Sequence, residues 1–165
     1  MKRIIVIAIS LFLLILENTI LPSYSIMQGY PSILFVFAIA FSIINGKEDA
    51  MFIGIVSGLL QDLFFINGFG INLLVNFLLC LLAAKIGEGI FKNNRIIPVI
   101  TCLIISILKI IMIAILFILF DKKINLNIAV MSALLNTIVM VIGYKFVLTT
   151  SKKYWKKDEW RFRWL

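Results

Sequence analysis

The sequence contains no histidine, and only eight of its 165 residues are aspartate or glutamate. Histidine is the commonest general base in enzymes and the commonest metal ligand. Its absence, together with so few carboxylates, argues against a hydrolase or metalloenzyme of the water-soluble kind. The chain also has no phosphate-binding loop, dinucleotide-binding glycine motif or nucleophile elbow. We therefore predict a protein that is not an enzyme and that binds no cofactor or metal.

Cysteine and polar residues are also scarce. Cys80 and Cys102 lie in separate apolar runs, so their spacing indicates neither a zinc site nor a disulfide framework. Hydrophobic residues make up 62% of the chain, whereas soluble domains are about half apolar. A domain of this size has too much surface to hide that excess from water. We therefore expect lipid to be part of its solvent.

Six apolar segments are candidate membrane spans. The hydrocarbon core is about 30 Å thick, which about 20 helical residues cross. No period-two alternation of the β-barrel kind is present, so the spans are predicted to be helices. We predict an all-α polytopic membrane protein, a bundle of about six transmembrane helices in a single domain, residues 1–150. The segments are approximately Ile4–Ile20, Ile33–Ile44, Ala50–Ile66, Ile71–Ile86, Ile96–Phe120 and Leu126–Leu148.

The basic residues predict the orientation. With both termini in the cytoplasm, only Lys109, Lys122 and Lys123 of the 16 lysines and arginines fall outside the cytoplasmic side. This is the distribution expected of a multi-pass protein of the cytoplasmic membrane with both termini inside. A cleaved signal peptide is an alternative for the N-terminus, because Lys2-Arg3 precedes an apolar run and Ser23-Tyr24-Ser25 supplies small residues. The run is long for such a peptide, and its removal would leave an odd number of spans.

Three ionisable residues fall at a similar depth in the predicted spans. Glu17 lies thirteen residues beyond Ile4, Asp62 thirteen beyond Asp49 and Lys109 thirteen beyond Ile96, which is about 20 Å along a helix from the cytoplasmic side. Asn76 reaches a similar depth from the outer side. Because a charge facing lipid is costly, we expect Lys109 to pair with Asp62, Glu17 or both. We favour a structural ion pair; a ligand or relay site, or a chance match in depth, are the alternatives.

The third segment also carries a stripe of small and polar residues. Gly54, Ser57, Gly58, Gln61 and Asp62 share one helix face, so another backbone can approach there closely. Whether that approach is internal or made by a partner is open. The fourth and sixth segments carry similar stripes, for which helix packing is the simplest interpretation. These comprise Asn72, Asn76, Cys80 and Ala84, and Ala129, Ala133, Asn136 and Gly143.

The last fifteen residues, 151–165, hold all three tryptophans and six basic residues. Tryptophan favours the headgroup region, and lysine and arginine favour anionic lipid. We predict a cytoplasmic interfacial tail that binds the membrane surface, with no nucleic-acid partner; a cytoplasmic protein partner is a further alternative. The residues concerned are Lys152, Lys153, Trp155, Lys156, Lys157, Trp160, Arg161, Arg163 and Trp164.

The stretch GLLQDLFFINGFGINLL, residues 58–74, resembles the MreD family of bacterial rod shape-determining membrane proteins. That family's pattern is a glycine, two or three apolar residues, an aspartate, and a short glycine-containing loop before the next span. Length and span layout extend the resemblance over nearly the whole chain, whereas Lys109 matches no family motif. The pattern falls on Gly58, Leu59, Leu60, Gln61, Asp62, Gly68 and Gly70, with Asn72 where the chain re-enters the membrane and Pro31 before the second span.

The resemblance implies a non-enzymatic component of the cell-elongation complex that supports cell shape and peptidoglycan synthesis. It implies binding to MreC and, through MreC, association with a RodA-type glycosyltransferase, a class B penicillin-binding protein and MreB. It also implies a fold similar to the substrate-binding subunits of energy-coupling-factor transporters.

Two rival functions remain at the level of sequence. One is a vitamin-binding subunit of an energy-coupling-factor transporter, but Ala8 and Ser10 lack the Ala-x-x-x-Ala spacing expected for docking the coupling module. The other is a membrane enzyme that acts on lipid with Asp62 and Glu17 as acid and base. The absence of histidine and of a metal-type carboxylate cluster argues against it.

Overall fold

A computed structural model describes residues 2–19, 30–64, 70–89, 96–119 and 126–154, and in these residues all regular structure is helical. The bounds agree with the six predicted segments to within a few residues, apart from a longer end to the last helix. The helices are α1 (Lys2–Thr19), α2 (Ile33–Asn45), α3 (Lys47–Phe64), α4 (Ile71–Glu88), α5 (Ile96–Leu119) and α6 (Leu126–Tyr154).

Two parts of the sequence-based predictions lie outside the described residues. One is Gly68 of the motif. The other is the interfacial tail, because α6 is described only to Tyr154 and the side chains of Lys152 and Lys153 are not described. The role of the tail and the division of the chain at residue 150 therefore stay predictions.

Local sequence accounts for the tight connection between α2 and α3. Ser32 caps the start of α2, where its Oγ accepts a hydrogen bond from Phe35 N at 3.4 Å. Gly46 alone separates α2 from α3 and has φ +92°, a left-handed conformation that glycine adopts without steric cost. Glu48 and Asp49 then lie in the first turn of α3, where negative charge favours a helix start. The two helices thus form a hairpin with no room for a loop.

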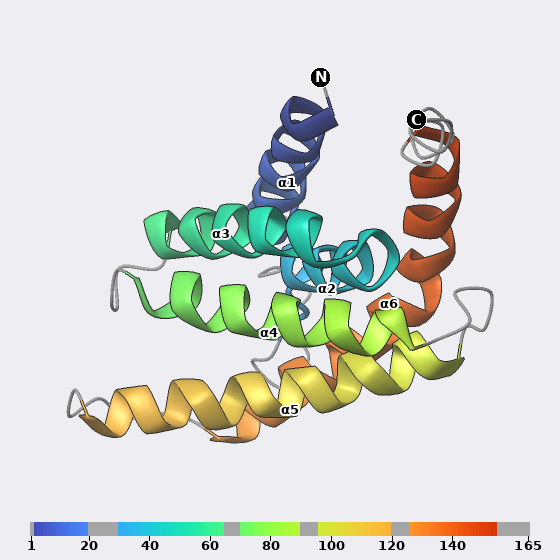
Figure 1. Cartoon of the computed structure of the whole chain (residues 1–165). Coiled ribbons are helices and arrows are strands. Elements are labelled where there is room, and N and C mark those ends of the chain that lie inside the picture. Colours follow the sequence, from blue (N-terminus) through green and yellow to red (C-terminus); the bar gives the residue numbers. More distant parts are fainter. Residues whose placement is uncertain (1, 20–29, 65–69, 90–95, 120–125, 155–165) are drawn as a thin grey trace.

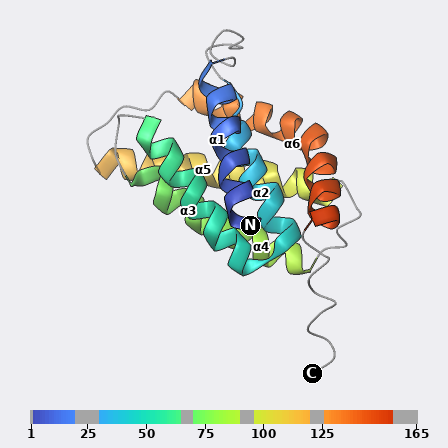
Figure 2. The same ribbon diagram turned by 90° about the horizontal axis from the view of Figure 1, so that it is seen from above.

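Helix α2 is the centre of the bundle, and it contacts each of the other five helices. Ten of its thirteen residues are buried. Around it, α3, α4 and α5 lie side by side in alternating directions, and α1 lies against α2 and α3 (Figure 1). Helix α6 packs on α5 and α2, and its C-terminal part then turns away from α5 (Figures 1 and 2).

The exposed surface is suited to lipid. Large apolar side chains are exposed along α5, such as Ile104, Ile111 and Ile118, and a soluble protein rarely shows such continuous apolar surface. Among the described helices, three are long and apolar enough to cross a membrane: Ile71–Glu88, Ile96–Leu119 and Asn127–Ser151. The described helices therefore form a bundle with a surface suited to lipid, and three of them could span a membrane.

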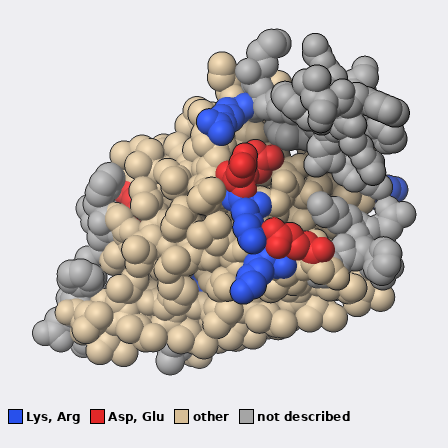
Figure 3. Space-filling model, in the orientation of Figure 1, with Lys and Arg blue, Asp and Glu red and all other residues tan. Residues whose placement is uncertain are grey.

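Exposed charges gather at one end of the bundle. Charged side chains form a band on the face shown in Figure 3, and most of the remaining described surface there is uncharged. Lys47, at the start of α3, pairs with Glu88, at the end of α4, at 3.5 Å. At the start of α1, the Arg3 guanidinium lies over the Phe52 ring, 5.4 Å from its centroid. These are the helix ends that the basic residues predict to be cytoplasmic.

Candidate functional site

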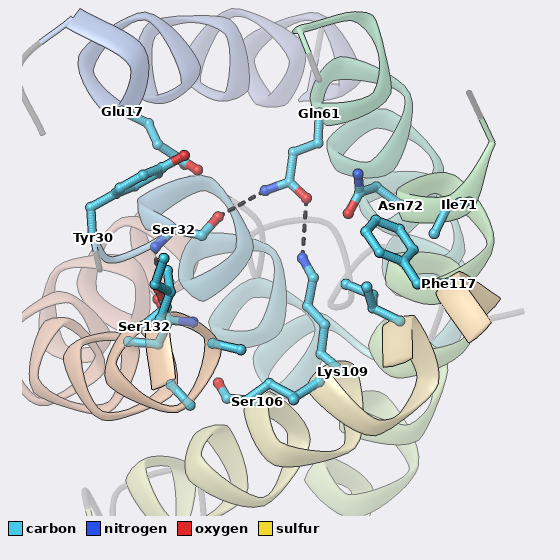
Figure 4. A pocket seen from close by; sticks show the side chains of 16 residues that line it. Glu17, Tyr30, Ser32, Gln61, Ile71, Asn72, Ser106, Lys109, Phe117 and Ser132 are labelled. Carbon is cyan, nitrogen blue, oxygen red and sulfur yellow. Dashed lines mark hydrogen bonds between the residues drawn. The ribbon is translucent and has the colours of Figure 1, made fainter. Parts of the chain in front are cut away.

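A cavity of about 320 Å³ lies at the opposite end of the helices. Because successive helices alternate in direction, the C-terminal parts of α1 and α3 meet the N-terminal parts of α2, α4 and α6 there. Helix α5 contributes its middle and C-terminal parts (Figure 4). The lining residues are Glu17, Tyr30, Ser32, Gln61, Ile71, Asn72, Ser106, Lys109, Ile110, Ile113, Phe117, Ile128, Ala129, Ser132, Ala133 and Asn136.

Asp62 caps the start of α4. Its Oδ2 accepts hydrogen bonds from the backbone N–H groups of Gly70 and Leu73, both at 2.9 Å, and its Oδ1 accepts one from Asn72 N at 3.0 Å. The first N–H groups of a helix lack partners within the helix and carry positive partial charge. Gly70, at the N-cap with φ +96°, has no side chain to supply that partner. Asp62, which is only 4% exposed, supplies it from the end of α3.

Glu17, near the end of α1, caps the start of α2 in the same way. Its Oε2 accepts a hydrogen bond from Leu34 N, in the first turn of α2, at 3.1 Å. The side chain is 1% exposed. In both pairs, α1 with α2 and α3 with α4, a carboxylate near the end of one helix thus satisfies the start of the next.

Lys109 forms no direct ion pair with Asp62 or Glu17, contrary to the sequence-based prediction. Its Nζ donates a hydrogen bond to Gln61 Oε1 at 3.1 Å and lies 4.0 Å from the centroid of the Phe35 ring. No carboxylate oxygen of a described residue lies within 4.0 Å of that nitrogen. The physical reason is that both carboxylates are turned to the backbone N–H groups of helix starts.

Gln61 connects the polar groups around the cavity. Its Nε2 donates to Ser32 Oγ at 2.7 Å, and its Oε1 accepts from Asn76 Nδ2 at 2.9 Å as well as from Lys109 (Figure 4). Ser32 N in turn donates to Asn136 Oδ1 at 2.7 Å. A single side chain of α3 therefore links residues of α4, α5 and, through Ser32, α6. Of the predicted polar layer, Asn76 and Lys109 meet at Gln61, whereas Asp62 does not line the cavity.

Sequence reasoning did not identify Ser32 or Ser106 as cavity residues. Ser32 had a usable signal, because a serine directly before an apolar segment and after Pro31 is typical of a helix N-cap. Ser106 had none in its own neighbourhood. It lies three residues before Lys109 on α5, and only the packing of other helices against α5 buries it.

The small stripe of α3 is an internal contact with α4. A Cβ added at Gly54 would lie 2.9 Å from the Cα of Phe77, and one added at Gly58 would overlap the backbone of Leu73. The predicted close approach of another backbone is therefore confirmed, and it is made within the bundle. Gly87 of α4 approaches the backbone of Ile43 in α2 in the same way.

A second, apolar groove of about 130 Å³ lies between α1 and α6 and has α2 as its floor. Helices α1 and α6 do not contact each other (Figure 2). A Cβ added at Gly143 of α6, which lines the groove, would meet no atom within 4 Å. The small residue at this position is therefore not used for packing within the described chain. The lining is Ile9, Leu13, Ile33, Val36, Phe37, Ala40, Phe41, Val139, Gly143, Phe146, Val147, Thr150 and Ser151.

In comparison with known proteins, residues 1–153 match a family model described as rod shape-determining protein MreD. No curated protein and no solved structure matches the chain. Within the described residues, no group of three or more histidine, cysteine, aspartate or glutamate side chains is arranged to hold a metal ion.

Proposed function

Because the chain belongs to the MreD family of rod shape-determining proteins, we propose that it is a non-enzymatic membrane component of the bacterial cell-elongation complex. In this proposal it binds the single transmembrane helix of MreC, and through MreC it joins a RodA-type glycosyltransferase, a class B penicillin-binding protein and MreB. The observation that carries the proposal is the apolar groove between α1 and α6.

The proposed topology has six spans, with both termini in the cytoplasm. Helix α2 has thirteen residues, about 20 Å in length, which is short for a hydrocarbon core of about 30 Å. It is nevertheless surrounded by the other helices, so its ends face protein instead of lipid. Ser32 bonds with Gln61 at one end, and Asn45 accepts a hydrogen bond from Ser151 at the other, at 2.6 Å. A short central span is therefore compatible with the membrane.

The groove suits a single apolar helix. Association of helices in lipid depends on close packing, because lipid is as apolar as a leucine side chain. Small residues allow that approach, and the groove offers Ala40 on its floor and Gly143 on one wall. A partner helix seated there would contact α1 and α6, which do not contact each other in this chain.

The test is to fill the groove without disturbing the fold. Gly143→Phe places a ring in the open space beside Gly143, and Ile142→Phe adds a ring on the exposed face of the same helix, where Ile142 is 75% exposed. Each variant is co-expressed with MreC, and the MreC recovered by affinity purification is measured at equal membrane levels of the two variants. We expect Gly143→Phe to lose most of the MreC and Ile142→Phe to retain it. Equal recovery would refute docking in the groove.

The polar cavity favours one second candidate, a substrate-binding subunit of an energy-coupling-factor vitamin transporter with a fold similar to such subunits. Purification from the native membrane in mild detergent, followed by mass spectrometry, separates the two. Recovery of MreC with wall synthases supports the elongation complex. Recovery of a pair of ATPases with their coupling subunit would support the transporter instead.

A further inference from the structure

No carboxylate oxygen of the described residues lies within 4.0 Å of the Lys109 ammonium group, so Glu17 and Asp62 act on its charge only from a longer distance. Its ammonium group has three N–H bonds, and it donates one hydrogen bond, to Gln61 Oε1 at 3.1 Å. Its two nearest candidates for an ion pair, Glu17 and Asp62, hold the starts of α2 and α4. The remaining donors belong to a side chain that lines the cavity, and Figure 4 shows Lys109 reaching from α5 toward Gln61.

A second polar group, Ser106, lies on the same helix face as Lys109. Ser106 lies one turn before Lys109, is 2% exposed and lines the cavity. Its Oγ makes no hydrogen bond of ordinary geometry to a described residue, and the Cys102 thiol beside it is only a weak partner. An orphaned buried hydroxyl costs free energy unless something satisfies it. A lysine ammonium with no carboxylate within 4.0 Å and a buried hydroxyl with no ordinary hydrogen bond, beside one cavity, are the complement of an anionic group.

The cavity also has polar lining residues, among them Glu17, whose Oε2 is turned to Leu34 N. The wall along α5 and α6 beyond Lys109 is mostly apolar. Ile110, Ile113 and Phe117 follow Lys109 along α5, and Ile128 and Ala129 face them from α6. The cavity is partly open, and its volume of about 320 Å³ is near the lower end of the range for small-molecule sites. It has room for a headgroup and the first part of an apolar chain, while a longer chain would extend outside.

We propose that this cavity binds the anionic group of an amphiphile, a phosphate or carboxylate attached to an apolar chain, with Lys109 as the charged contact and Ser106 as a hydrogen-bond donor. Ile110, Ile113 and Ala129 contact the start of the apolar chain. In the proposed topology the cavity lies in the outward half of the bundle, so an outer-leaflet lipid can reach it. A free phosphate has the same anionic chemistry and is the other source. The site is independent of the groove for MreC.

The test measures thermal unfolding of the purified full-length chain in non-ionic detergent, followed by the helical circular dichroism signal. The added probes are phosphatidylglycerol, phosphatidylcholine and inorganic phosphate, with sodium chloride matched for ionic strength. A saturating ligand that binds only the folded protein is expected to raise the melting temperature by roughly 5 °C. We expect this shift with phosphatidylglycerol and not with phosphatidylcholine. An equal shift with inorganic phosphate would support the anion site and assign it a soluble ligand.

Matched variants assign the shift to the cavity. Lys109→Met removes the charge and is expected to abolish the shift, while Lys109→Arg keeps it. Ala129→Phe fills the apolar part and leaves the charge in place, so it should reduce the shift with lipid even if Lys109→Met does not fold. Lys47→Gln removes an exposed basic residue at the other end of the bundle and should change nothing. The proposal is overturned if neither anion stabilises the wild type, if phosphatidylcholine does so equally, or if Lys109→Met and Ala129→Phe respond like the wild type.

Discussion

The cap that Asp62 places on α4 gives the sharpest prediction of stability. Asp62→Ala removes three hydrogen bonds to backbone N–H groups at 2.9 to 3.0 Å and leaves those donors partly buried without partners. Loss of a helix N-cap costs about 0.5–2 kcal/mol, and hydrogen bonds to a charged group are each worth about 1.5–3 kcal/mol. Because the start of α4 can relax toward water, we expect a total loss of about 3 kcal/mol.

Asp62→Asn separates the geometry of the cap from its charge. The asparagine amide keeps one oxygen that can accept from these N–H groups, so we expect a smaller loss, about 1–2 kcal/mol. Glu88→Ala is the matched control, because Glu88 is an exposed carboxylate in a surface pair with Lys47 and should cost less than about 1 kcal/mol. Unfolding in detergent micelles, followed by helical circular dichroism, measures all three.

A double-mutant cycle decides between the cap and the ion pair that the sequence suggested. Since Asp62 and Lys109 make no direct contact and interact only through their charges, the losses for Asp62→Ala and Lys109→Met should add to within about 1 kcal/mol. A coupling energy well above 1 kcal/mol, or an Asp62→Ala variant as stable as the Glu88→Ala control, would refute the role of Asp62 as a cap.

Two further predictions concern helix α3. Gly58→Leu should destabilise the protein by about 1–3 kcal/mol, because its Cβ would overlap the backbone of Leu73. Leu59→Ala, on the exposed face, should change stability by about 0.5 kcal/mol or less in the same unfolding assay, and equal effects of the two would mean that Gly58 is not a contact. Gln61→Leu should cost about 2–4 kcal/mol, because three polar partners each lose a hydrogen bond, while Leu63→Ala on the exposed face should cost much less. A neutral Gln61→Leu would show that the network does not stabilise the bundle.

The positions of the helices could be predicted because the signals for them are local. Apolar runs of about helical length, separated by breaks such as Gly46 and Gly70, locate all six, and the acidic turn at Glu48 and Asp49 predicts where α3 begins. The glycine stripe was also readable, since the spacing of Gly54 and Gly58 places both on one face whatever the rest of the chain does.

The partners of the buried polar residues were not predictable in the same way. Helical rise gives the depth of Asp62 and Lys109, and depth alone made them appear to be a pair. Depth does not show how each helix is rotated about its axis, and so it does not show which groups each side chain faces. A clue for Asp62 existed, because a helix that starts after Gly70 has no N-cap side chain of its own and must find an acceptor elsewhere.

From the sequence alone we could predict that this chain is a helical membrane protein, where its helices lie, and that its basic residues gather at one end of the helices. Those properties follow from composition and from order along the chain, which packing does not alter. Only the packing of the helices shows that Asp62 and Glu17 accept hydrogen bonds from the starts of neighbouring helices, that Lys109 lines a cavity, and that Gly143 lines a groove. These depend on how six helices rotate and pack against one another, because hydrogen bonds act only between atoms that the fold has brought within about 3 Å.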